Sequence, residues 1–427
     1  MQLYRNARLV DGAGRAAIEQ AALAVDHDKI AYAGPERDLP AGLVPAGAEM
    51  LDLGGRTLLP GLFNCHVHLA LRFPFSSYVV DEYHSPAYRA MVCYRRAAEA
   101  LACGVTTIRG VGDCDWSDLA VRDAIAKSMV MGSRVVASGP IIIAHGGHGA
   151  NGWGSIQCSG PYEFTRAARS VLFKGADLVK ICITGGMNGE HEGAADTQMT
   201  AEEIRAVTSV AANAGKLVAA HLGHDAAIRL AVENGVLSVE HAYIMNQETA
   251  ALMAERGAWL VPTLSVSNAL DYLEAHNNPR YHIEKIRQIG QIHKKSIQNA
   301  VAAGVKLCVG TDLLPSDPID GTNATVREVE LLAEAGLSNL EAIRAATGNS
   351  AELCGVSDVT GTLAPGKQAD FIAVDGRPDH NISDLRRLAL VVKGGTVVRS
   401  SVPGLAVTGF PLLPFGQLPQ GASFIDW

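Results

Sequence analysis

Several features that would assign the protein to a particular class are missing from its sequence. Its eight cysteines are scattered and include no CxxC pair, and several lie in apolar runs, which favours reduced core thiols over a disulfide framework. No stretch approaches the roughly 18 consecutive apolar residues of a membrane-spanning helix. The first residues, MQLYRNARLVDG, lack the basic segment followed by an apolar segment that marks a signal peptide. We therefore expect a soluble cytoplasmic protein.

The sequence also lacks an excess of positive charge. It contains 36 Lys and Arg against 44 Asp and Glu, a formal net charge of -8, which argues against nucleic acid or an anionic membrane as the main partner. With 427 residues, 48% of them hydrophobic, the chain is long enough for a large core. Length alone suggests two or three domains, but single α/β barrels also run well past the average domain size.

Both ends of the chain have the pattern of short β-strands separated by turns. Residues 1–57 and 358–402 contain apolar runs broken by Gly, Pro and Asp, such as AALAVDHDKIAYAG and GTLAPGKQADFIAVDGRP. We predict that these two segments pair into one small β-sandwich. Residues 403–427 form a Pro- and Gly-rich apolar tail that could pack on the central part of the chain or on a neighbouring subunit.

The middle of the chain, residues 58–357, alternates strand-like runs with helical segments. The strand-like runs are LFNCHVHL, GVTTIRGV, SRVVASGP, DLVKICITGG, KLVAAHL, VLSVEHAY, AWLVPTL and VKLCVGTD. Segments such as TAEEIRAVTSVAANAG and NQETAALMAERG lie between them and end in Gly, as many helices do. About eight such repeats predict an α/β fold in which a (β/α)8 TIM barrel carries the small β-sandwich. An open doubly wound sheet is the alternative, but no GxGxxG follows the first strand.

Polar residues lie at the carboxyl ends of the predicted strands, where the active sites of such barrels are found. The first strand ends in His66-Val67-His68, and residues i and i+2 of an extended chain project to the same side. Further strands contribute Lys180, His221, His241 and Asp312. Each of these alone could be structural, for example a core histidine or a helix cap. Together at one rim they predict a metal site, and imidazole and carboxylate ligands suit zinc.

Lys180 lies within an apolar run, ADLVKICITGG, where an ammonium group without a partner would be costly to bury. Four histidines and one aspartate are many ligands for one ion and few for two. A neutral lysine amine that adds carbon dioxide becomes a carbamate, an anionic group with two oxygens that can bridge two cations. We therefore hypothesise two divalent ions and a carbamate on Lys180; an ion pair is the alternative role for this lysine.

The motifs around these residues resemble one known group of enzymes. They are LDLGGRTLLPGLFNCHVHL, GVTTIRGVG, GGHG, VKICITGG, LSVEHAY, VGTD and LEAIRAATGNSAELCGV followed by GTLAPGKQADFIAVDG. In this order they resemble the amidohydrolase superfamily, specifically the imidazolonepropionase-like group with Xaa-Pro-type dipeptidases, lysine- or arginine-directed carboxypeptidases and ochratoxin-type amidases. The resemblance spans nearly the whole chain.

The resemblance implies a ligand set and a reaction. One ion, usually zinc, would be held by His66, His68 and Asp312, and the other by His221 and His241, with carbamylated Lys180 and a hydroxide bridging them. The hydroxide would attack the amide carbonyl of an N-acyl amino acid, a dipeptide or a related small amide. Asp312 would carry the proton from the water to the leaving nitrogen. Relatives are commonly homo-oligomers, so we expect the same here.

Three further residues are predicted to contact the substrate. His148, in AHGGHGANGW, could stabilise the oxyanion, and Tyr243, just after His241, could hydrogen-bond the substrate. The alternative for each is loop structure or core packing. Arg109, at the end of the second barrel strand, could bind a substrate carboxylate, but a structural ion pair is an equal alternative. His224 is interpreted as structural.

The sequence departs from its relatives at three positions, and other functions stay open. Asn64 and Gly110 stand where many relatives carry Asp, but neither position is a metal ligand. Thr322 stands where dipeptidase relatives often carry His, which weakens a dipeptidase assignment.

Cyclic amide or lactam hydrolysis is a near alternative. A mononuclear deaminase is less favoured, because such enzymes carry Glu at the position of His224 and lack the bridging lysine. An inactive barrel used for assembly would have no reason to retain the ligands.

Overall fold

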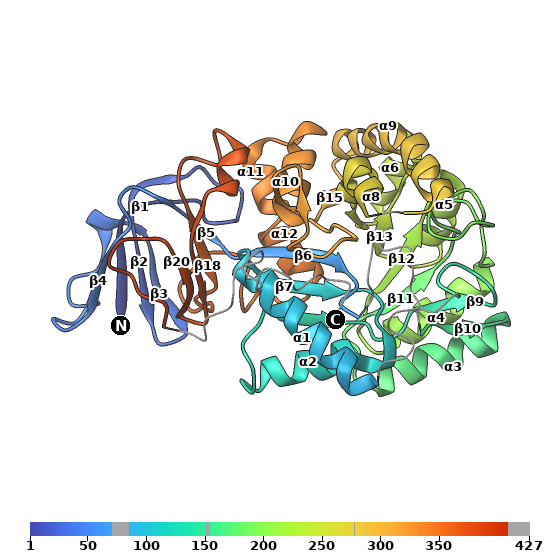
Figure 1. Ribbon diagram of the computed structural model, residues 1–427, viewed down its shortest axis with the longest axis horizontal. Coiled ribbons are helices and arrows are strands. Elements are labelled where there is room, and N and C mark those ends of the chain that lie inside the picture. The colour runs from blue at the N-terminus through green and yellow to red at the C-terminus, as the bar shows by residue number, and fades with distance from the viewer. Residues whose placement is uncertain (71–84, 151–153, 277, 409–427) are drawn as a thin grey trace.

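The computed structural model describes residues 1–70, 85–150, 154–276 and 278–408. Figure 1 shows two parts along the long axis of the molecule, a β-rich part that contains the N-terminus and a larger part in which strands are surrounded by helices. Within the described residues, no helix combines the length and the apolar character needed to cross a bilayer.

The small domain is a sheet made from both ends of the chain. Its eight strands run in the order β20-β19-β18-β5-β1-β2-β3, with β4 paired to β1. They are β1 (Gln2–Leu9), β2 (Ile18–Asp26), β3 (Lys29–Pro35), β4 (Glu49–Asp52), β5 (Thr57–Pro60), β18 (Phe371–Val374), β19 (Leu388–Lys393) and β20 (Thr396–Ser400). The pairing of the two chain ends is therefore confirmed.

The strands from the two chain ends form one continuous sheet. Strand β5 joins the two halves, because it pairs parallel with β1 on one edge and antiparallel with β18 on the other. The two halves enclose a common core, in which the ring of Tyr4 packs edge-on against Phe371 at 5.0 Å between ring centroids. Of the predicted tail, residues 409–427 lie outside the described part of the chain.

The larger part is built on parallel strands. A three-stranded sheet has the order β6-β7-β8, and a seven-stranded sheet has the order β10-β9-β11-β12-β13-β14-β15. The strands are β6 (Leu62–Val67), β7 (Val105–Gly110), β8 (Arg134–Ala137), β9 (Ile142–Ala144), β10 (Ile156–Cys158), β11 (Val179–Cys182), β12 (Val218–Leu222), β13 (Ser238–His241), β14 (Trp259–Val261) and β15 (Lys306–Leu307). All eight predicted strand-like runs form strands, whereas β9 and β10 were not predicted.

Backbone hydrogen bonds join the two parallel sheets at two places. Cys65 N of β6 donates to Val309 O after β15 at 2.7 Å, and Asp177 N before β11 donates to Ala137 O of β8 at 2.8 Å. These bonds connect the sheets without extending either ladder. The carboxyl ends of the strands consequently face one common rim.

Helices cover the outside of these strands (Figure 1). They are α1 (Pro86–Ala102), α2 (Ser117–Ala126), α3 (Gly160–Phe173), α4 (Ala201–Asn213), α5 (Asp225–Glu233), α6 (Gln247–Glu255), α7 (Leu264–Ser267), α8 (Leu270–Ala275), α9 (Arg280–Ala303), α10 (Ala324–Glu334), α11 (Asn339–Ala345) and α12 (Gly348–Leu353). Helix α4 illustrates why they form where they do. Thr200 and Glu203 make a reciprocal capping box, and Ile204, Val207 and Ala211 recur at helical spacing on its buried face.

Candidate metal centre

The six residues predicted as metal ligands come together at the carboxyl rim of the parallel strands. His66 belongs to β6, Lys180 to β11, His221 to β12 and His241 to β13, whereas His68 and Asp312 follow β6 and β15. All of them except Asp312 are buried, and the residues His66, Lys180 and His241 have at most 2% of their surface exposed. The parallel register explains the convergence, because the carboxyl ends of neighbouring strands lie at the same edge.

The distances within this group are short. Asp312 Oδ1 lies 3.5 Å from His66 Nε2 and 3.3 Å from His68 Nε2. The ring of His241 lies 4.7 Å from that of His66 and 4.5 Å from that of His221, between centroids. One ligand atom each of His66, His241 and Asp312 all lie within 4.8 Å of one another, as binding to one ion or a close pair requires.

Each imidazole is also held from its other nitrogen. The Nδ1 atoms of His66, His68 and His241 lie 2.7 Å from Glu240 Oε2, Gly112 O and Thr263 Oγ1, respectively. His221 differs, because its Nε2 is the atom that contacts a backbone carbonyl, Gly185 O, at 3.2 Å. Such contacts orient metal-binding histidines and select their tautomers. The second ring nitrogen, which could hold a metal, is Nε2 in His66, His68 and His241 but Nδ1 in His221.

Burial gives these groups the protonation states that metal ligands need. It lowers the pKa of His66, His221 and His241 well below the ordinary value, so the rings stay neutral and keep a lone pair. It also lowers the pKa of Lys180, which favours the neutral amine that can react with carbon dioxide. Burial alone would raise the pKa of Asp312, but its interactions with His66, His68 and Lys180 outweigh this effect and favour the carboxylate. This set of nitrogen and oxygen donors fits divalent ions such as zinc.

The backbone at this rim is held in an unusual conformation. His241 and Asp312 have positive φ angles of 68° and 55°, and Thr263, which holds the His241 ring, has a φ of 57°. Residues with side chains adopt this left-handed region at a cost of about 1–3 kcal/mol each. Their concentration at the ends of β13, β14 and β15 is typical of a functional site, where surrounding structure maintains the strain.

The site and the fold agree with what comparison with known proteins shows. Residues 57–398 match the amidohydrolase family. The chain belongs to this family. It is therefore a hydrolase that acts on carbon–nitrogen bonds. The resemblance inferred from its motifs is confirmed.

Individual relatives of this amidohydrolase are similar over nearly its full length. An ochratoxinase from Aspergillus niger is 28% identical over 430 residues, which cover 94% of this chain and 87% of that protein. An imidazolonepropionase from Agrobacterium fabrum is 26% identical, with 87% and 89% covered. The solved structure of a Xaa-Pro dipeptidase with bound methionine in the active site is 29% identical and superimposes with a TM-score of 0.84 over 93% of this chain and 100% of that one.

In this amidohydrolase, His148 and Tyr243 lie next to the histidine cluster. Their roles in substrate binding stay predictions. The ring of His148 lies 4.3 Å from that of His221, and its Nδ1 lies 2.7 Å from Glu192 Oε1. The ring of Tyr243 stacks on His241 at 5.1 Å with an interplanar angle of 13°. Both therefore border the predicted metal site.

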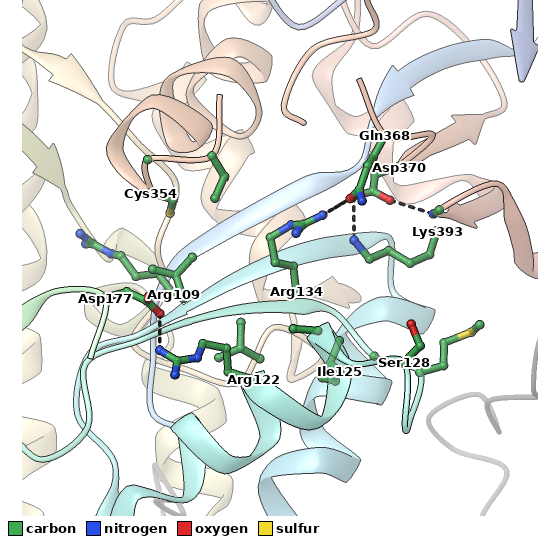
Figure 2. A pocket seen from close by; sticks show the side chains of 18 of the residues that line it. Arg109, Arg122, Ile125, Ser128, Arg134, Asp177, Cys354, Gln368, Asp370 and Lys393 are labelled. Carbon is green, nitrogen blue, oxygen red and sulfur yellow. Dashed lines mark hydrogen bonds and ion pairs between the residues drawn. The ribbon is translucent and has the colours of Figure 1, made fainter. Parts of the chain in front are cut away.

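Arg109 does not lie where it could bind a substrate at the rim, and that prediction is corrected. Its guanidinium donates from Nε to Cys65 O at 2.6 Å, from Nη1 to Ser238 Oγ at 2.9 Å and from Nη2 to Glu240 Oε1 at 2.8 Å. Figure 2 shows it near Cys354 in the wall of a cavity of about 1230 Å³, which is lined by residues at the amino ends of the strands and by the small domain. The ion-pair alternative accounts for this arginine.

The partner of Arg109, Glu240, is a site residue that sequence reasoning missed. It is completely buried, and its other oxygen contacts His66. The signal was present, because a charged residue in the apolar run VLSVEHAY is as unexpected as Lys180 in its own run. Without the fold, however, its partners could not be identified.

The structure shows the surroundings of Asn64, Gly110 and His224. The amide of Asn64 donates to Thr311 Oγ1 at 2.8 Å and accepts from Thr311 N at 3.2 Å, so it ties β6 to the segment that carries Asp312. Gly110 lies beside the buried Asp113, whose Oδ2 would stand 3.4 Å from a Cβ at position 110. His224 contacts Thr197 Oγ1 at 2.9 Å, in keeping with its structural interpretation.

Proposed function

We propose that the protein is a binuclear metal-dependent amidohydrolase with a (β/α)8 barrel, which cleaves an N-acyl amino acid, a dipeptide or a related small amide. The observation that carries this proposal is the burial of Lys180 among four histidines and Asp312. A lysine with a lowered pKa, surrounded by metal ligands, has little reason to be there as an ammonium. As a carbamate it would supply the anion that two cations need.

The proposed ligands divide into two sets. His66, His68 and Asp312 would hold one divalent ion, most simply zinc, and His221 and His241 the other, with the Lys180 carbamate between them. When bound, such ions polarise the substrate carbonyl and lower the pKa of water. The contact between Asp312 and both His66 and His68 supports the first set.

Asp312 is proposed as the general acid–base. Its carboxylate is the form favoured in the folded protein, so it can accept a proton from the attacking water. The same carboxyl group can then deliver this proton to the leaving nitrogen of the amide. Its position at the rim, with 16% of the side chain exposed, leaves it accessible to a substrate.

His148 and Tyr243 are proposed to bind the substrate around the scissile carbonyl. Glu192 accepts a hydrogen bond from His148 Nδ1 and so orients the ring beside His221. In the doubly protonated form of this ring, Nε2 can also donate toward a developing oxyanion. Burial raises the pKa of Tyr243 well above its ordinary value, so its hydroxyl keeps the proton and can donate a hydrogen bond. An apolar cluster next to Tyr243 would suit an apolar substrate group; it contains Met187, Ala194, Leu273, Ile283, Ile286 and Ile289.

The named relatives support the substrate class. The ochratoxinase and the Xaa-Pro dipeptidase point to linear amides, whereas the imidazolonepropionase keeps cyclic amides or lactams as an alternative. A mononuclear deaminase is less well supported, because His224 occupies the position of the glutamate expected there and turns to Thr197.

Metal analysis of the active enzyme, combined with a panel of N-acyl amino acids, dipeptides and lactams, tests this proposal. We expect about two divalent ions per chain and hydrolysis of a linear amide. Fewer than one ion per chain in fully active enzyme contradicts the binuclear centre. Turnover of lactams alone would favour cyclic amides over linear amides as the substrate class. Asp312→Asn should lower kcat by roughly 10²–10⁴-fold, as expected for the loss of a general acid–base group.

A further inference from the structure

Behind His66 lies a chain of buried charged groups that reaches away from the rim. Glu240 Oε2 lies 2.7 Å from His66 Nδ1. Glu240 Oε1 accepts hydrogen bonds from Ser238 Oγ at 2.6 Å and from Arg109 Nη2 at 2.8 Å. Arg109 and Glu240 have 1% and 0% of their side chains exposed, so water cannot substitute for these contacts.

We propose that Glu240, held in place by Arg109 and Ser238, is a positioning residue that selects the metal-binding tautomer of His66. A carboxylate can only accept a hydrogen bond from the imidazole, so the proton of His66 lies on Nδ1. The lone pair of His66 then lies on Nε2, the atom that faces Asp312. This inference rests on the proposed function only in taking His66 as a metal ligand.

Arg109 and Ser238 determine which way the Glu240 side chain faces. Arginine has donors and no acceptor, so the atom of residue 240 that it contacts must be an acceptor. The orientation of the Arg109 guanidinium is itself fixed, because its Nε donates to the backbone oxygen of Cys65. Cys65 is the residue directly before His66. The ring of His66 and its backbone are therefore oriented by one arginine–glutamate pair that joins β6, β7 and β13.

Simple charge neutralisation of Arg109 would explain less of this geometry. It would require one oxygen of Glu240 at the guanidinium, whereas the second oxygen is aimed at the ring nitrogen of a metal-site histidine. Carboxylate partners of this kind fix the ring and raise its basicity as a ligand, and their loss typically weakens metal affinity about 10–100-fold.

The decisive variant is Glu240→Gln, which keeps the shape but changes one oxygen to an amide NH2. Arg109 and Ser238 would retain the amide oxygen as their acceptor, and the NH2 group would then face His66 Nδ1. This would drive the His66 proton to Nε2. We expect a folded protein with two-state melting that binds one of its two ions about 10–100-fold more weakly, measured with zinc by competition against a chelator.

Asp370→Asn is the matched control. The Asp370 side chain is also 0% exposed and also pairs with cationic side chains, but its partners are Lys393 and Arg134, away from the histidine cluster. This variant should bind both ions with wild-type affinity. Wild-type affinity in folded Glu240→Gln, or an equal loss in Asp370→Asn, would overturn the proposal.

A measurement on the unmodified, metal-loaded protein does not depend on how the variants fold. In protein loaded with ¹¹³Cd, a ligand bound through Nε2 couples the metal to both ring carbon protons, whereas a ligand bound through Nδ1 couples it to Hε1 alone. We expect the Nε2 pattern and a slowly exchanging Nδ1 proton for His66. The Nδ1 pattern for His66 overturns the inference. If wild-type protein binds neither zinc nor cadmium, the proposed function is contradicted instead.

Discussion

Gly186 lies directly against the ring of His148. A Cβ built on Gly186 would stand 2.3 Å from His148 Cε1 and 2.7 Å from both ring nitrogens. On its other sides the ring contacts Glu192 and packs on His221. The glycine at the end of VKICITGG is therefore needed for the close approach of β11 to the loop that carries His148.

We predict that Gly186→Ala displaces His148 and lowers kcat while both metal ions stay bound. A misplacement of about 1 Å can cost about 10²-fold in rate, and the contact is far below a normal carbon–carbon separation. Steady-state kinetics and metal analysis of the same preparation measure this. Gly47→Ala is the control, since a Cβ there meets nothing within 4 Å. Unchanged kcat in Gly186→Ala would show that His148 has no role in turnover.

Lys180→Ala should abolish the proposed bridge. We expect activity to fall by at least about 100-fold, because even the outer partners of metal ligands are worth 10–100-fold. Short-chain carboxylic acids should restore part of the activity and of the metal content by replacing the carbamate. Lys393→Ala is the control, because Lys393 is a partly buried lysine of the small domain that pairs with Asp370. Full activity with two ions in Lys180→Ala would refute the carbamate.

Tyr243→Phe separates the hydroxyl of Tyr243 from its ring. Loss of one hydrogen bond to the substrate should lower kcat/KM by about 10-fold, with metal content unchanged, because Phe can still stack on His241. Tyr243→Ala should in addition weaken metal binding, since His241 loses its stacking partner. Equal effects of the two substitutions on metal content would contradict a separate role for the hydroxyl.

The metal-free protein should lose stability as the pH falls below about 6.5. The folded state depresses the pKa of His66, His221 and His241 below the ordinary 6.5, so in this range the unfolded chain binds more protons than the folded one. Each histidine then lowers the free energy of unfolding by up to about 1.4 kcal/mol per pH unit. Urea titrations at pH 7.5, 6.5 and 5.5 measure the slope.

A variant identifies the source of this slope. His66→Asn should reduce the dependence by one proton. If His66→Asn and wild-type protein have the same slope between pH 6.5 and 5.5, burial of His66 does not control the acid sensitivity.

Much of the site could be predicted because its signals are local. Alternating strand-like and helical runs are properties of neighbouring residues, and each predicted run became a strand. The HxH pattern of His66 and His68 and the lysine in ADLVKICITGG needed only the position of a strand end. The family resemblance then supplied the roles of these residues.

The arrangement of atoms within the site depends on contacts between distant segments. Arg109 and Glu240 are 131 residues apart, so neither the ion pair nor its contact with His66 can be read from the chain. The strands β9 and β10, of three residues each, were not among the predicted runs.

The amino-acid sequence was thus sufficient to identify the strands and the family of this amidohydrolase and to propose its metal ligands, because these follow from local periodicity and motif. The fold alone shows that the ring of His221 contacts a backbone carbonyl through Nε2, whereas the rings of His66, His68 and His241 contact their partners through Nδ1. It also shows that Arg109 forms a buried ion pair with Glu240. Both depend on which side of a ring or guanidinium meets a partner, and only the packing of strands far apart in the chain determines that.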